Sequence, residues 1–173
     1  MDTFMIVFRL IHILAGMVWL GSATLVVLFL APAAAEVGPA AGPLVANLVL
    51  KRRVTRFVVG SGGVTVLAGA VLYWEDARRY GSLGAFVGSD FGVALTIGAV
   101  AALAALTVGA AIVAPGMERG VRMAGDLARP EGPPAPEQTE RLLALQARTR
   151  RASRTAVALI AIAAAAMSTA RYW

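Results

Sequence analysis

Four long apolar runs constrain this chain more than any other feature of its sequence. A helix rises about 1.5 Å per residue, so about 20 mainly apolar residues cross the roughly 30 Å hydrocarbon layer of a membrane. The runs cover residues of about 4–30, 57–74, 91–114 and 156–170. No alternating pattern is long enough for a transmembrane β-barrel. We therefore predict an all-α integral membrane four-helix bundle that forms a single domain over residues 1–173.

The composition excludes several other classes of protein. Hydrophobic residues make up 58% of the chain and charged residues 15%, whereas soluble domains average about 45–50% and 25%. This argues against a water-soluble fold and excludes a disordered chain, and the basic excess indicates topology rather than a nucleic-acid partner. Because there is no cysteine, disulfides, thiolate metal sites and cysteine nucleophiles are also excluded. We expect membrane lipids to surround the spans.

Basic residues are distributed unevenly over the segments between the apolar runs. Twelve of the sixteen arginines and lysines lie in segments 36–56 and 115–155, and segment 75–90 has two. With four spans, the two basic segments lie on one side of the membrane, and segment 75–90 lies with both termini on the other. Loops rich in basic residues stay in the cytoplasm. We therefore predict that both termini lie outside, where Tyr73, Trp74 and Tyr80 would occupy the aromatic interface.

A cleaved signal peptide over residues 1–35 is a competing interpretation of the first run. Its cleavage region would be Ala33 to Ala35. The acidic Asp2 and an apolar run longer than 7–15 residues argue against it. We keep the first run as a membrane span.

The segments between the spans predict helices that continue into the cytoplasm. Gly42-Pro43 resembles a helix start, so we expect one helix from about Leu44 to Trp74. Residues 115–155 predict a helical hairpin that extends the third and fourth spans, with its turn at the prolines between 130 and 136. Spans two, three and four would thus all have cytoplasmic helical extensions. The hairpin carries four closely spaced basic residues, which we call the hairpin arginines: Arg148, Arg150, Arg151 and Arg154.

The hairpin arginines have two interpretations. Near a membrane surface, each basic residue gains about 1 kcal/mol from anionic lipid headgroups. They can therefore fix topology and contact lipid, or they can form a docking surface for a partner protein.

Small residues are frequent inside the second and third spans. Gly60, Gly62, Gly63 and Gly69 lie in one, and Gly98, Ala102, Ala105 and Gly109 in the other. Close backbone approach drives helix association in lipid, so these residues favour a compact bundle. They could instead provide space for a flat cofactor.

Few motifs for catalysis occur. There is no phosphate-binding loop and no Gly-x-Ser-x-Gly motif, and a His-Glu-x-x-His zinc motif is impossible because His12 is the single histidine. The sequence therefore favours a protein without enzymatic activity of its own.

One stripe of the first span carries the best candidate site. Arg9, His12, Gly16 and Trp19 are spaced three, four and three residues apart, which places them on one helix face. Ionisable residues inside a span cost free energy and by default mark a functional site. Three interpretations remain open: haem or metal binding by His12 with Arg9 as its electrostatic partner, a structural contact between helices, and proton or metal handling. With one histidine, a second haem ligand would come from another chain or a methionine (Met5, Met17 or Met167), or the position would stay open.

The segment from Arg9 to Gly21, with its histidine, small residues and Trp-x-Gly, resembles the first span of a group of small bacterial membrane proteins. The group includes copper-resistance D-like proteins and HemJ-type protoporphyrinogen oxidases. The resemblance covers about 25 residues closely and implies a four-helix bundle in a bacterial inner membrane, with haem b or metal contact at His12. Haem-binding members carry another histidine on a later span, which this chain lacks.

Two functions follow from these observations. The favoured one is an accessory or structural subunit of a larger membrane complex, associated with other subunits or with itself. The alternative is a redox-linked membrane protein that binds haem b or a metal through His12.

Overall fold

The computed structural model describes residues 3–128 and 135–172, and all elements within these ranges are helical. Four helical stretches are long and apolar enough to cross a membrane, as the sequence predicts. They run over Thr3–Lys51, Val54–Arg79, Asp90–Leu127 and Pro136–Tyr172. The proline-rich turn predicted near residues 130–136 lies largely outside the described residues.

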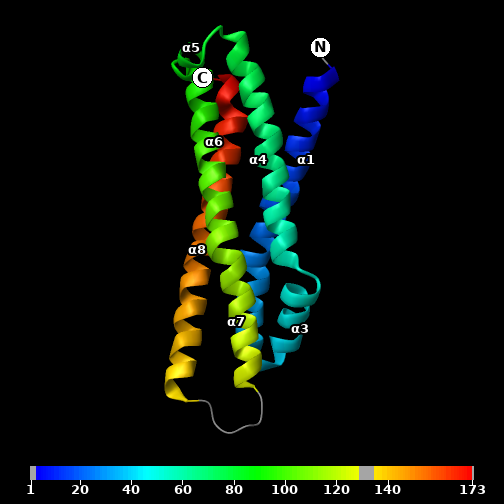
Figure 1. The fold of residues 1–173 in the computed structure, drawn as a ribbon, viewed down its shortest axis with the longest axis vertical. Helices are drawn as coiled ribbons and strands as arrows, with labels where there is room; N and C mark the ends of the chain where they lie inside the picture. Colours follow the sequence, from blue (N-terminus) through cyan, green and yellow to red (C-terminus); the bar gives the residue numbers. More distant parts are fainter. Residues whose placement is uncertain (1–2, 129–134, 173) are drawn as a thin grey trace.

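Figure 1 shows the helices of the described residues running up and down the long axis of the molecule. Elements named η are π or 3₁₀ turns. The elements are α1 (Thr3–Leu25), η1 (Val26–Leu30), α2 (Ala31–Val37), η2 (Gly38–Ala41), α3 (Gly42–Ala46), η3 (Asn47–Lys51), α4 (Val54–Arg79), α5 (Leu83–Val87), α6 (Asp90–Val108), η4 (Gly109–Val113), α7 (Ala114–Leu127), α8 (Pro136–Thr169) and η5 (Ala170–Tyr172).

The long helices form two closely packed pairs, α1 with α4 and α6 with α8. Figure 1 shows the start of α1, the end of α8 and the short α5 at one end of the molecule, with α3 and α7 toward the other. A core made mainly of alanines joins the pairs: Trp19, Ala23, Ala101, Ala102, Ala105, Ile160 and Ala163. Because alanine brings backbones close together, this composition suits helix association in lipid.

The helical path continues past Pro32 and Pro115, the prolines that come just after the first and third apolar runs. In both places a π turn comes first, and the proline follows two residues after its end. Proline lacks an N–H group and clashes with the preceding turn of an α-helix. A π turn widens the backbone at that point, so the chain continues into α2 and α7.

The single helix expected from Leu44 to Trp74 is wrong. Arg53 has a left-handed backbone with φ of 54°, which ends η3 and starts α4 in a new direction. The preceding α3 and η3 instead lie against α7. Gly38, with φ of 70°, makes the earlier turn after α2, as glycine can without steric cost. By contrast, α8 runs unbroken from Pro136 to Thr169.

An aromatic cluster closes the end of the molecule at α5. Phe86 is fully buried, and its ring lies 4.9 Å from that of Tyr73 and 5.2 Å from that of Tyr80. Ser82 and Ser89 cap α5 and α6 by accepting hydrogen bonds from Ala85 N–H and Gly92 N–H, each at 3.1 Å. Of the predicted interfacial aromatics, Trp74 is exposed, whereas Tyr73 is turned inward to Phe86 and donates or accepts a 2.7 Å hydrogen bond with Thr96.

Candidate functional site

The face of α1 that carries the predicted stripe packs against α4. A Cβ built on Gly69 would lie 2.8 Å from the His12 ring, and one on Gly62 would lie 2.6 Å from Trp19. Between these contacts, a Cβ on Gly16 would lie 3.4 Å from the Thr65 methyl group. Along α1, the contacts advance by four residues and then by three. Along α4, the matching contacts go back by four residues and then by three. The two antiparallel helices therefore interlock, with each large side chain facing a glycine.

His12 is fixed to α4 by a hydrogen bond across the interface. Its Nδ1 lies 2.8 Å from the backbone oxygen of Thr65. Because a carbonyl oxygen only accepts, Nδ1 must be the donor, and in a neutral ring Nε2 then carries the lone pair. Within residues 3–128 and 135–172, Nε2 has no hydrogen-bond partner. His12 is half-buried.

Trp19 connects this interface to the centre of the bundle. It is 4% exposed and belongs to the core between the two helix pairs. Gly62 allows its indole ring to lie directly on the backbone of α4. The tryptophan therefore fixes the spacing of α1 and α4 and contributes to the contact with α6 and α8.

Arg9 differs from the other members of the stripe. It is exposed, and the described part of the chain contains no ion pair to it. The structure therefore brings His12, Gly16 and Trp19 together against α4 and leaves Arg9 at the surface, nearer the start of α1.

The donor set for a cofactor at this face consists of the His12 ring. Gly16 faces Thr65 rather than a space for a flat ring. Met17 is 66% exposed and Met5 is buried, while Met167 packs against Gly98 of α6. No cluster of three or more His, Asp and Glu side chains suited to a metal occurs among the described residues. The lone pair of Nε2 is of the kind that would bind a haem iron, but the stripe provides no second ligand.

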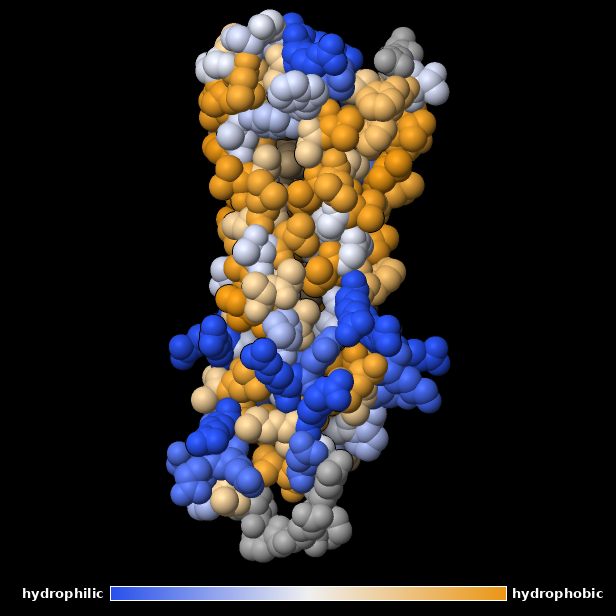
Figure 2. Space-filling model, viewed as in Figure 1, coloured by the Kyte–Doolittle hydropathy of each residue, from blue (hydrophilic) through white to orange (hydrophobic). Residues whose placement is uncertain are grey.

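The hairpin arginines are all exposed on α8. The face seen in Figure 2 has hydrophilic residues at its upper end, an apolar zone beneath them, and a belt of hydrophilic residues below that zone. The hairpin arginines lie level with α7, because Gly116 of α7 packs against Thr149 of α8. An ion pair of 3.6 Å between Arg56 and Glu118 joins α4 to α7 at this level. Basic residues distant in sequence therefore gather at one depth of the molecule.

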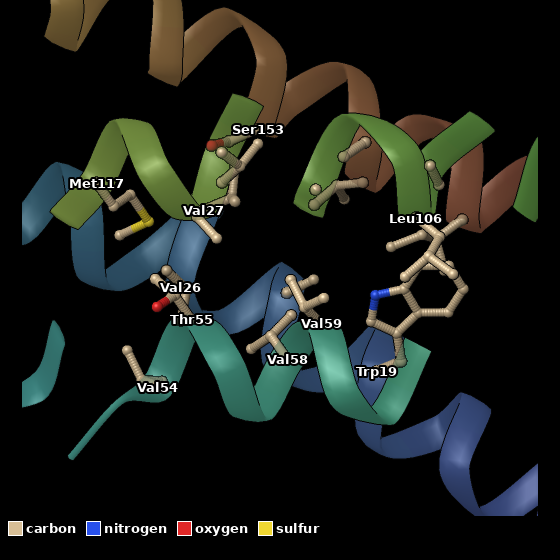
Figure 3. A pocket seen from close by; sticks show the side chains of 18 residues that line it. Trp19, Val26, Val27, Val54, Thr55, Val58, Val59, Leu106, Met117 and Ser153 are labelled. Carbon is tan, nitrogen blue, oxygen red and sulfur yellow. The ribbon is translucent and has the colours of Figure 1, made fainter. Parts of the chain in front are cut away.

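A cavity lies between the helix pairs at this depth (Figure 3). Its volume is about 70 Å³, and its lining is mainly aliphatic, with contributions from all four spanning stretches. In Figure 3, Thr55, Ser153 and Met117 lie toward one end and Trp19 and Leu106 toward the other. Sequence reasoning did not find this cavity. Its only local signal is the polar Thr55 just before an apolar run.

No family model, curated protein or solved structure matches this chain.

Proposed function

We propose that the chain is a non-catalytic, multi-pass subunit of a larger assembly in a bacterial inner membrane. The observation that carries this proposal is the interlocked contact of α1 with α4. The stripe that the sequence marks as the best candidate site holds two helices together. His12 forms a hydrogen bond to Thr65, and the Trp19 ring packs on Gly62. Such polar and close-packed contacts are how helices associate in lipid.

The outer side of α1 supports association with other subunits. Only 11% of the most apolar window of the first spanning stretch is buried. Large apolar side chains such as Leu14, Met17 and Phe29 are more than half exposed. Such a surface is covered either by lipid or by another protein, and we assign part of it to a neighbouring subunit.

The basic belt supports the orientation predicted from the sequence. The apolar zone of Figure 2 would lie in the membrane, and the belt would lie at the cytoplasmic leaflet. The part of the molecule below the belt, including most of α7 and the start of α8, would then extend the spans into the cytoplasm. Both termini would lie in the periplasm. The hairpin arginines would contact anionic lipid headgroups.

Native mass measurement in mild detergent tests the proposal. We expect the chain to be recovered in a stable complex with other membrane subunits. A Met17→Trp substitution on the exposed side of α1 should weaken that complex at least tenfold, because the added bulk blocks a protein neighbour but not fluid lipid. Leu67→Trp, on the 71% exposed Leu67 of α4, is the matched control and should leave the complex intact. A monomer under all mild conditions would refute the proposal.

A second function is favoured by one specific observation: Nε2 of His12 has no hydrogen-bond partner among the described residues. Histidines that bind metals commonly donate their other N–H to a backbone carbonyl, which fixes the ring and its tautomer. The hydrogen bond to Thr65 provides this arrangement. Haem b bound at His12 would supply one-electron chemistry, while the chain would orient the imidazole and place Arg9 one turn away.

Absorption spectroscopy of protein extracted without added cofactor tests this second function. A Soret band that is lost in His12→Ala would support it, provided that the variant still unfolds cooperatively. A colourless and metal-free preparation would reject haem or metal binding and would leave the subunit proposal untouched.

A further inference from the structure

Thr55 has a buried hydroxyl group without a hydrogen-bond partner. The residue is 6% exposed, and its Oγ1 is the buried side-chain oxygen or nitrogen left unpaired in the described ranges. Elsewhere in the helices, hydroxyl groups donate to the carbonyl four residues earlier, as Thr65 does to Ser61 and Ser153 does to Thr149, both at 2.8 Å. A buried hydroxyl without a partner is costly in a protein interior.

The break at Arg53 explains why Thr55 differs. Thr55 is the second residue of α4, so the carbonyl four residues earlier belongs to Lys51, beyond the left-handed Arg53. Because the backbone leaves the helical path there, that carbonyl does not lie one turn behind the threonine. The hydroxyl group must therefore find its partner in the cavity that it lines.

Other polar groups line the same cavity. Ser153 Oγ donates to the backbone but keeps lone pairs that can accept. Trp19 Nε1 is a donor, and in Figure 3 it is directed toward the interior of the cavity. The π turns η1 and η4 also contribute lining residues, among them Val27 and Gly109.

The size of the cavity decides what can fill it. Each water takes about 30 Å³ in the liquid, and a buried water needs two to four polar partners. A volume of about 70 Å³ is therefore suited to about two waters. Benzene binds in an engineered cavity of about 150 Å³. An aromatic guest of that size is therefore too large for this cavity.

We propose that this cavity is an internal hydration site, in which about two ordered water molecules are held by Thr55 and Ser153. The first water satisfies the Thr55 hydroxyl group. The second lies beside Ser153, whose Oγ accepts a hydrogen bond from it. This site is independent of the proposed subunit role.

The direction in which one substitution changes the melting temperature, Tm, tests the proposal. Thr55→Val keeps the shape of the side chain and removes the hydroxyl group. If the hydroxyl binds water, the variant loses a hydrogen bond, and Tm in detergent should fall by about 2–4 °C. If the hydroxyl is dry and unpaired, its removal should leave Tm unchanged or raise it, and either result would overturn the proposal. Thr107→Val, at an exposed threonine that bonds to Leu103, is the control for the substitution itself.

One further measurement separates water from other sources of oxygen. The Tm comparison is then repeated after exhaustive delipidation. A persistent fall in Thr55→Val supports water, whereas loss of the effect assigns the oxygen to a lipid-phase molecule and overturns the proposal.

Discussion

Gly62→Ala should destabilise the protein, whereas the adjacent Gly63→Ala should not. A Cβ at position 62 would lie 2.6 Å from Trp19 Cε2 and 2.9 Å from its Nε1, but one at position 63 meets nothing within 4 Å. Trp19 is 4% exposed and has little room to move. Overpacking of this kind costs about 1–3 kcal/mol, while alanine gains up to about 1 kcal/mol in helix propensity over glycine at either position.

The pair of variants isolates the packing contribution, since the gain in propensity is common to both. The free energy of unfolding should therefore be lower in Gly62→Ala than in Gly63→Ala by about 1–3 kcal/mol. Reversible unfolding of both purified variants in the same mixed micelles, followed by far-UV circular dichroism, measures the difference. Equal stabilities would mean that Trp19 does not lie on the backbone of α4, and the interlocked interface would be refuted.

Three further substitutions test other parts of the structure. Tyr73→Phe removes the 2.7 Å hydrogen bond between α4 and α6 and should lower the free energy of unfolding by about 0.6 kcal/mol; Tyr80→Phe, whose hydroxyl has no such bond within the described ranges, should have a smaller effect. Arg53→Gly should match or exceed the wild-type stability because glycine tolerates the left-handed backbone. Arg53→Val should lower the free energy of unfolding by about 1–2 kcal/mol. Thermal unfolding compares the two variants, and equal stabilities would contradict this expectation. Gly116→Ala should lower the free energy of unfolding by about 1–3 kcal/mol, because its Cβ would collide with Thr149 of α8. Gly120→Ala in the same helix is the control, since a Cβ there meets nothing within 4 Å. Chemical unfolding compares the two variants.

The spanning helices could be predicted because their signal is local. A run of about 20 apolar residues crosses a membrane whatever its neighbours are. The 3–4 spacing of His12, Gly16 and Trp19 likewise defines a helix face without knowledge of its partner. That this face lies on α4 required the structure, since glycines such as Gly60 and Gly62 look alike in sequence but only the second receives a side chain.

The missed features depend on contacts between distant segments. Arg53 carries none of the usual sequence preference for a left-handed backbone, which favours glycine and asparagine, and its conformation accompanies the packing of α3 and η3 on α7. The prolines at positions 32 and 115 ordinarily predict helix ends. The π turns before them accommodate these prolines within a continuous helix, and no local sequence pattern predicted those turns. The cavity beside Thr55 arises where four separate stretches meet.

The two wide turns also change how the spanning sequences should be interpreted. An α-helix advances about 100° per residue, and a π turn spends one additional residue on a single rotation. Positions before Val26 and after Leu30 therefore do not share one helical wheel, and the same holds on either side of Gly109–Val113. A plot with a single period through residues 3–37 would misplace the positions after the turn by about 100°. A one-residue deletion in either turn would restore an ordinary α turn and would leave the downstream residues facing the same way.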